Sequence, residues 1–377
     1  MSEYQYYEFA AVDRPLEGPQ IEQLRRLSTR ARITPTSFVN TYEWGDFPGE
    51  PRRLVERYFD AFLHVANWGT RELMLRFPRR LVDLETTRQY CGGGVSSAWS
   101  CGEHVIVAAG SEDEEGDFEW GGEGVLASLL PVRSEVLAGD ERPLYLLWLL
   151  GVQAGEVGDD VVEPPVPAGL DALSGSQAAL AEFLRIDGDL MAVAAAGSVR
   201  RREADVDVER WVAGLAAGER DALLAGLLRG EDSFLRAQAL RRARSALGRT
   251  QWPLTLGEGG VRRSVGQLAK EAAARRAERE RVERVRRRQL AAGRERRAAK
   301  SRRERLATLA AEGEGAWARV GARIAEKKPA GYDAAVELIV ELGAVSGKAE
   351  FARRIEGLRV EHRRRPGFIG RLDAAGL

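Results

Sequence analysis

The stretch from Ser264 to Glu312 reads SVGQLAKEAAARRAERERVERVRRRQLAAGRERRAAKSRRERLATLAAE and contains no proline. Nearly every residue in it is a good helix former, and only Gly266 and Gly293 weaken the pattern. Glutamates precede arginines by four residues at several places, which is the favourable order for pairing along a helix. The stretch therefore predicts one long helix, with the rest of the chain on either side of it.

The charges of this chain are separated into two blocks. Between residues 262 and 305, 18 basic and 6 acidic side chains give a net charge of +12. Between residues 111 and 163, 14 acidic and 2 basic side chains give −12, and the whole chain is formally neutral. Two opposite blocks predict either pairing within the protein or two faces for different partners, and two solvated faces are the simplest alternative.

The predicted long helix is polar on all sides, so it is either exposed to solvent or bound to a charged partner. A two-stranded coiled coil is disfavoured, because Gln289, Arg296 and Arg303 would occupy one of its two seam positions. Arginines that contact phosphates are the other option, so nucleic acid is the first partner to test. The candidate residues for binding nucleic acid or an acidic partner are Arg279, Arg284, Arg286, Arg287 and Arg288.

Length and hydropathy indicate the general class of protein. A chain of 377 residues predicts two or three domains. The N-terminus lacks a basic region followed by an apolar run, and the most apolar window, 144–152, is far shorter than the roughly 20 residues that cross a bilayer. We therefore expect a cytoplasmic protein that has no membrane association and no cofactor, and whose oligomeric state the sequence leaves open.

Residues 1–110 predict a small α/β domain in which strands and helices alternate as β-α-β-α-β-α-β-β. The apolar residues from Leu54 to Leu63 predict one helix that begins near Pro51. The expected strands are 4–12, 36–44, 70–77, 97–101 and 104–109.

The remainder of the chain predicts mostly helices, so the expected fold class is α+β with a large excess of helix. The helix around Trp148 is apolar nearly all round, which predicts that it is buried. Asp187 is expected to cap another helix. The predicted segments are an acidic loop with buried helices (111–162), a proline-rich linker (163–169), a helical domain (170–250), a loop (251–260), the arginine-rich helix (262–312) and a C-terminal helical module (313–377).

Four residues near the aromatic cluster of the first domain, Trp44, His64, Asn67 and Trp68, are candidates for lining a pocket. The alternative is that these aromatics belong to the core, which is the usual place for aromatics at strand and helix spacing. The glycine-rich run 91–97 predicts either backbone N–H groups offered to an anion or a turn that enters a hairpin.

Three further residues, Cys91, Cys101 and His104, are weak candidates for metal ligands. Tetrahedral zinc would need a fourth ligand, and the chain has no CxxC pair, so two buried thiols and a hydrogen-bonded imidazole are the favoured interpretation. The run 343–349 imitates a phosphate-binding loop but ends in Ala349 where Mg²⁺ requires a hydroxyl, so we expect it to join two helices.

Four short motifs stand out in the first 80 residues: Tyr7-Glu8-Phe9, Asp13-Arg14-Pro15-Leu16, Trp44-Gly45-Asp46-Phe47 and Asn67-Trp68-Gly69-Thr70. With these motifs the chain resembles an uncharacterised family of bacterial, actinobacterial proteins, and this resemblance implies no particular activity. The C-terminal half, from Trp211 to Arg242 and from Trp317 to Pro366, resembles the helical TPR-like segments of SWIM-associated bacterial proteins. The SWIM zinc ligands are absent, so the resemblance implies helices and carries over no zinc or nucleic-acid function.

The sequence favours a non-catalytic scaffold or interaction protein with a protein partner, and nucleic acid as a further partner of the basic helix. The alternative is an enzyme of unknown reaction with its site in the N-terminal domain. A concave pocket in which carboxylates, His64 or Asn67 converge would favour the enzyme.

Overall fold

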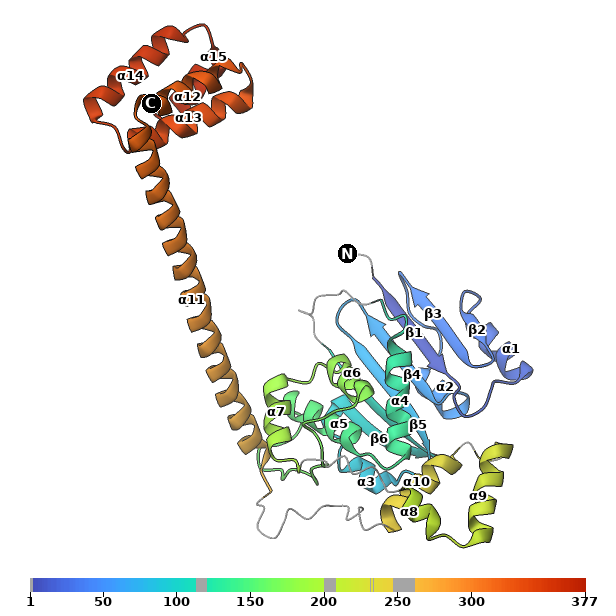
Figure 1. Ribbon diagram of the computed structural model, residues 1–377. Coiled ribbons are helices and arrows are strands. Elements are labelled where there is room, and N and C mark those ends of the chain that lie inside the picture. Colours follow the sequence, from blue (N-terminus) through green and yellow to red (C-terminus); the bar gives the residue numbers. More distant parts are fainter. Residues whose placement is uncertain (1–2, 113–120, 200–207, 231, 233, 247–261) are drawn as a thin grey trace. The chain divides into compact units, whose positions relative to one another are not determined.

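The computed structural model describes residues 3–112, 121–199, 208–230, 232, 234–246 and 262–377. The chain forms two compact units, residues 1–278 and 279–377 (Figure 1). Part of the acidic run, 113–120, and the predicted loop 251–260 lie outside the described residues. The predicted fold class is confirmed, because one sheet is followed by a long succession of helices.

The sheet of the first unit has seven strands in the order β2-β3-β1-β4-β5-β7-β6, and every pair of neighbours is antiparallel. The expectation of an α/β domain is therefore wrong for residues 1–110, because such domains contain parallel strands. The strands are β1 (Gln5–Ala10), β2 (Arg32–Thr34), β3 (Ser37–Tyr42), β4 (Ala61–Ala66), β5 (Arg71–Pro78), β6 (Ser96–Cys101) and β7 (His104–Ser111).

Strand β4 is the main element that the sequence did not predict. The helix expected through Leu63 ends at Arg57, and Phe62 and Leu63 belong to β4 instead. This strand lies in the middle of the sheet and is buried on both faces, so its residues are apolar except for His64 and show no polar alternation. Such a run cannot be distinguished from a buried helix by its periodicity.

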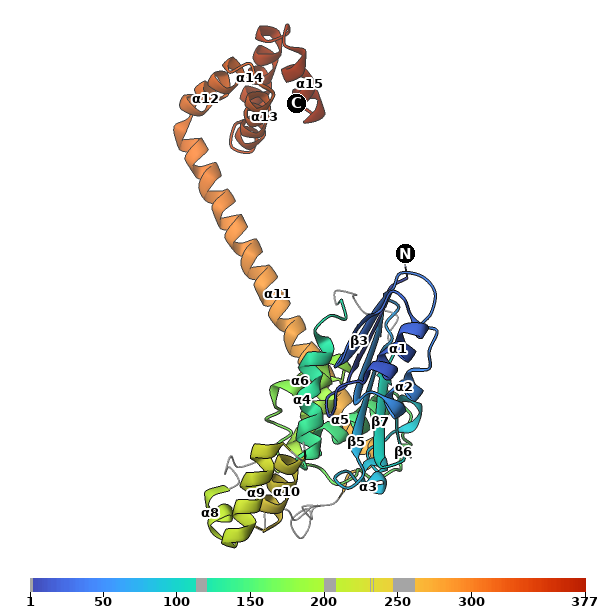
Figure 2. The same ribbon diagram turned by 90° about the vertical axis from the view of Figure 1, so that its right-hand side faces the viewer.

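Helices cover the two faces of the sheet unequally (Figure 2). The larger core lies between the face that carries Leu63, Leu73 and Val107 and the helices α4, α5 and α6. The smaller core lies on the opposite face, where Phe9 and Phe62 pack beneath α1 and α2. The covering helices are α4 (Val125–Leu137), α5 (Arg142–Gln153), α6 (Gly175–Phe183), α1 (Gly18–Leu27) and α2 (Pro51–Arg57).

The first unit contains six further short helices among the described residues. Asp187 caps α7 as expected, because its Oδ1 accepts a hydrogen bond from the backbone N–H of Leu190 at 2.8 Å. These elements are α3 (Leu84–Arg88), the 3₁₀ helix η1 (Gly93–Val95), α7 (Gly188–Ala196), α8 (Val208–Ala213), α9 (Ala217–Arg229) and α10 (Leu235–Ala246).

Two opposed ion pairs are buried where β1, β4 and β5 meet α4. The Asp60 carboxylate accepts hydrogen bonds from Arg76 at 2.7 and 3.1 Å, and both side chains are almost fully buried. Arg133 binds Asp13 through two bonds of 2.7 and 2.6 Å, and its Nη2 lies 4.0 Å from Asp60. The second oxygen of Asp60 accepts from the backbone of Val12 at 2.7 Å. Each charge in this cluster is therefore balanced by a neighbour.

The long predicted helix is confirmed as α11, Val265–Glu312, and its first residues are fixed to the core of the first unit. Arg263 binds the Glu163 carboxylate at 2.9 and 3.0 Å, and the hydroxyl of Tyr145 also donates to that carboxylate. The same guanidinium lies against Gly197, where a Cβ atom would be 2.5 Å from its Nη2. The ends of the acidic and basic blocks thus pair here, and the first unit includes the proline-rich segment 163–169.

The second unit has its own core around Val320, Ile339 and Phe368. The P-loop-like run joins two helices, as expected, since α13 ends at Gly343 and α14 begins at Lys348. Pro366 begins the last helix, which suits proline because the first helical N–H needs no partner. The helices after α11 are α12 (Glu314–Ala325), α13 (Pro329–Gly343), α14 (Lys348–Glu361) and α15 (Pro366–Ala374).

Candidate functional site

The five candidate arginines lie on the exposed part of α11. Arg287 pairs with Glu283 one turn earlier, which is the order of residues that the sequence predicted. The hydrogen bond and the charge of Arg287 lower the pKa of the Glu283 carboxyl. Among the described residues, Arg284 and Arg288 form no ion pair. The guanidinium groups of Arg284 and Arg288 are therefore available to a partner.

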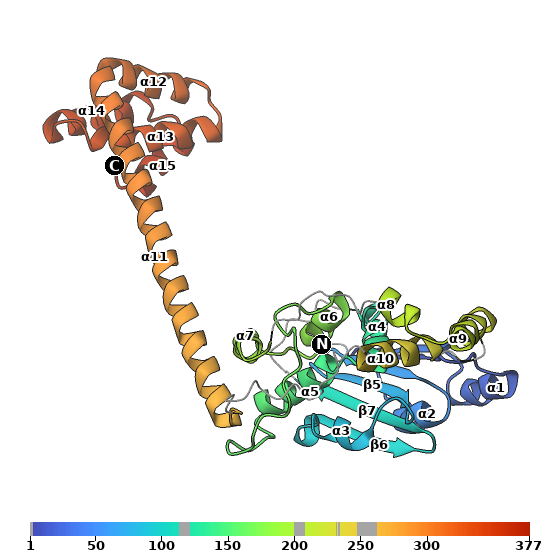
Figure 3. The ribbon, with the colours of Figure 1, turned by 60° about the horizontal axis from the view of Figure 1, so that its bottom comes forward.

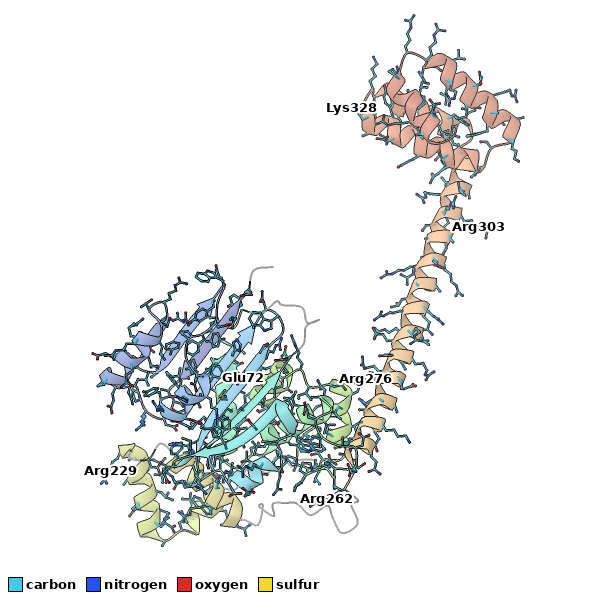
Figure 4. All side chains as sticks on the ribbon, turned by 180° about the vertical axis from the view of Figure 1, so that it is seen from behind. Glu72, Arg229, Arg262, Arg276, Arg303 and Lys328 are labelled. Carbon is cyan, nitrogen blue, oxygen red and sulfur yellow. The ribbon has the colours of Figure 1, made fainter. Side chains whose placement is uncertain are left out.

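The basic residues at the start of α11 differ from these, because they are bound to the first unit. Arg276 pairs with Asp187 at 2.9 Å, and Arg275 lies 3.5 Å from Asp189 (Figure 4 labels Arg276). The basic residues at the start of α11 thus attach the helix to the first unit, whereas the exposed ones further along are not needed for this attachment.

The four candidate pocket residues lie at the same end of the sheet but have different surroundings. Trp44 is 70% exposed beneath the guanidinium of Arg30, and Trp68 is 44% exposed. Asn67 joins the turn after β4 to β1, because its Oδ1 accepts from the backbone N–H of Tyr4 at 3.0 Å. His64 alone of the four lies within the sheet, in β4.

His64 belongs to a row of polar residues that crosses the sheet. The pairing register places Tyr7, His64 and Glu72 side by side on β1, β4 and β5, with Gly110 of β7 at the end of the row. The rings of Tyr7 and His64 stack at 4.2 Å. The Nε2 of His64 is buried and has no hydrogen-bond partner among the described residues. Burial lowers the pKa of His64 to about 4, although the charge of Asp46 opposes the shift.

His64 should make the stability of the first unit depend on pH. Between pH 6.5 and 4 the unfolded chain binds a proton that the folded chain does not bind, so stability is lost as the pH falls through this window. The shift corresponds to about 3 kcal/mol. We expect His64→Gln to remove this loss, so that urea unfolding at pH 7 and at pH 4 differs less in the variant than in the native protein.

The control for this measurement is His104→Gln. Burial also lowers the pKa of His104, but this ring is less buried, so a smaller change in the same direction is expected. Identical pH dependence in the native protein and in His64→Gln would contradict the assignment.

The candidate metal ligands are not brought together. Cys101 and His104 are register partners at one end of the β6–β7 hairpin, whereas Cys91 precedes the opposite end of β6. The thiol of Cys91 donates to the carbonyl oxygen of Thr87 at 3.6 Å, and burial raises its pKa to about 11. In the part of the chain that the structure describes, no group of three or more His, Cys, Asp or Glu residues is placed to hold a metal ion.

The glycine-rich run before β6 uses its N–H groups within the chain. The N–H of Gly92 donates to Ser96 at 2.8 Å, and that of Gly94 donates to Glu156 at 3.3 Å. The run is thus a turn that enters a hairpin. The anion that its N–H groups meet is the carboxylate of Glu156.

Sequence reasoning missed Glu72 and Ser111. Both residues line a hollow of about 690 Å³ at the corner of the sheet where β7 extends beyond the edge strand β6 (Figure 3 shows this edge, and Figure 4 labels Glu72). A lone glutamate in a strand carries no signal in the sequence, because its importance depends on which residues the register places beside it.

Comparisons with protein-family models, with curated proteins and with solved structures find no match for this chain. No helix in the described ranges is both long enough and apolar enough to cross a membrane.

Proposed function

We propose that this protein is a non-catalytic interaction protein and that α11 binds the phosphate backbone of nucleic acid. The observation that supports the proposal is the exposure of α11 to solvent. From Ala273 to Arg305 every residue is exposed to solvent, apart from the half-buried Gly293. Side chains of α11, Arg303 among them, project from all sides of the helix (Figure 4). The fold therefore does not require most of this charge.

The net charge of the second unit also supports an anionic partner. Residues 279–377 contain 25 basic and 14 acidic side chains, a net charge of +11. A field of this sign attracts phosphates within about a Debye length and speeds their association. Arginines distributed around a helix suit contacts with a phosphate backbone, which need no particular base sequence.

The test is the salt dependence of binding to a nonspecific DNA duplex and to RNA. On B-DNA each neutralised phosphate contributes about −0.9 to the slope of log affinity against log salt. We expect the triple change Arg284→Gln, Arg286→Gln and Arg288→Gln to flatten this slope by roughly 2–3 units. Glutamine has nearly the helix propensity of arginine, so the helix should persist and can be checked by circular dichroism.

A matched control changes the same net charge elsewhere in the second unit. Arg319, Arg323 and Arg371 are each ion-paired to a carboxylate, so their replacement by glutamine should change the slope by less than about one unit. Equal effects of the two triple variants would mean that net charge, and not α11, determines binding.

Two outcomes would overturn the proposal. The first is that the intact protein binds neither duplex nor RNA at about 50 mM salt, where phosphate contacts are strong. The second is that a peptide of residues 262–305 binds well while the intact protein binds weakly, because the basic helix is then neutralised within the protein. Saturable binding of an acidic protein, without binding of nucleic acid, would assign α11 to a protein partner.

A further inference from the structure

An apolar groove, here called the α9 groove, lies among the helices α8, α9 and α10 of the first unit. Helix α10 packs against α4, and both α8 and α9 pack against α10 or lie beside it (Figure 1). The groove has a volume of about 530 Å³. Its lining is mostly apolar and includes Trp211 and Val212 of α8, Leu224 and Leu227 of α9, and Leu240 of α10. Apolar side chains of a partner can therefore enter it.

Helix α9 contributes leucines that this chain leaves in contact with solvent. Leu224, Leu227 and Leu228 are 58%, 50% and 79% exposed, and no residue of α9, every one of which the structure describes, is buried. Val212 of α8 is also exposed beside the same groove. Single exposed leucines are normal on a protein surface, but a contiguous apolar patch around a groove is typical of an interface. We therefore expect another chain to cover the α9 groove.

The shape of the patch favours a second copy of this chain. Leu224 and Leu228 lie one turn apart and form a ridge along α9, and the α9 groove follows the same helix. A two-fold interface requires a ridge and a groove next to each other, because each copy offers its partner the same surface that it receives. Two copies related by a two-fold axis can each place this ridge against the groove of the other.

The charges of α9 favour the same partner. The helix carries Glu219 and Asp221 near its start and Arg229 at its end, and with Arg220 its net charge is zero. In an antiparallel pair about a two-fold axis, the acidic start of each helix lies beside the basic end of the other. The rim of the groove carries both signs, because Asp221 lies there with Arg220 and Arg236. A strongly acidic or strongly basic partner would thus meet like charge as well as opposite charge.

We propose that the α9 groove is the interface of a homodimer in which α9 packs antiparallel against α9 of a second copy. Leu224 and Leu228 of each copy then enter the groove of the other. An interface of standard size covers about 800 Å² on each partner, so α8 and α10 contribute to it beside α9. This interface belongs to the first unit and does not depend on binding by α11. A dimer carries two α11 helices, so nucleic acid that reaches both is bound more tightly than by one.

The experiment is sedimentation equilibrium of the full-length protein, free of nucleic acid, at concentrations between about 1 and 100 µM. We expect a monomer–dimer equilibrium. Leu224→Gln combined with Leu228→Gln should weaken dimerisation by at least about 100-fold, because each dimer contains both changes twice. Both side chains are exposed and glutamine suits a helix, so circular dichroism and urea unfolding should match the native protein.

The matched control is Val282→Gln combined with Leu290→Gln on α11, where the native side chains are 54% and 57% exposed. This variant removes a similar amount of exposed apolar surface outside the α9 groove. We expect its dissociation constant to stay within about threefold of native, as for most surface changes. A dimer lost in this variant would assign self-association to a coiled coil of α11 and would overturn the proposal.

A charge exchange tests the antiparallel arrangement. Asp221 is the acidic residue to change, because Glu219 already pairs with Arg242 in the same chain. Asp221→Arg should weaken dimerisation by roughly 3- to 10-fold at low salt, the effect of disturbing two exposed ion pairs. Adding Arg229→Asp to the same chain should bring the dissociation constant back to within about threefold of native, because opposite charges then face each other again.

Three results would overturn the proposal. The first is a monomer at every concentration up to about 100 µM, which is weaker association than a specific interface of this kind provides. The second is equal weakening by the two double variants, because the leucines of α9 would then have no special role. The third is a charge exchange that binds no more tightly than Asp221→Arg alone.

Discussion

Asp60→Ala is expected to lower the free energy of unfolding of the first unit by about 3–5 kcal/mol, the range for removing one member of a buried ion pair. The change leaves the guanidinium of Arg76 buried beside that of Arg133, with only Asp13 to balance two positive charges. It also leaves the backbone N–H of Val12 without its acceptor. The loss is measured by urea unfolding of the native protein and the variant.

An exposed ion pair provides the control for this prediction. Glu85 lies 3.0 Å from Arg88 with both side chains largely in solvent, so Glu85→Ala should cost less than about 1 kcal/mol. A loss for Asp60→Ala as small as that for Glu85→Ala would show that the buried cluster is rearranged or hydrated when one charge is removed.

Trp148→Ala is expected to cost about 3–5 kcal/mol, the range for large-to-small changes in a core. Trp148 is 2% exposed, and its ring lies 5.6 Å from that of Tyr145 within the larger core. The variant leaves a cavity that α5 cannot fill, since nearly every other side chain of that helix is already buried. Urea unfolding followed by far-ultraviolet circular dichroism measures the loss.

Trp68→Ala is the matched control, because this tryptophan is 44% exposed in the turn between β4 and β5. A change of less than about 1 kcal/mol is expected there. If Trp148→Ala cost less than about 1 kcal/mol, the assignment of α5 to the core would be wrong.

The sequence predicted the helices of this protein better than its sheet. The limits of α11 follow from its composition, because a long run of Ala, Arg and Glu without proline favours helix at every position. Strand β4 was missed, since its apolar residues serve two cores and lack alternation. The direction of the strands was also missed, because antiparallel pairing depends on long-range contacts that local patterns do not encode.

The candidate sites also divide into those that depend on local sequence and those that depend on long-range contacts. The arginines of α11 could be found from the sequence, because exposure of a polar helix follows from its own residues. Glu72 could not be found, because its environment is created by His64 on one neighbouring strand and Gly110 on the other. Among the predicted pocket residues, His64 pairs with Glu72 in the register and Asn67 is used in a turn.

The contact between Arg263 and Gly197 has a consequence for the architecture of the first unit. Gly197 and Arg263 touch each other, and between them Phe234 and Ala237 pack against the larger core. Helices α8, α9 and α10 therefore have the topology of an inserted domain, which enters and leaves its host at one place. The entropic cost of bringing the two ends of an inserted segment together rises only weakly with its length, by about 0.6 kcal/mol for each doubling. Arg241 of α10 donates hydrogen bonds to the carbonyl oxygens of Val136 and Leu137 at 3.0 and 2.7 Å, and these bonds hold the inserted helices against α4.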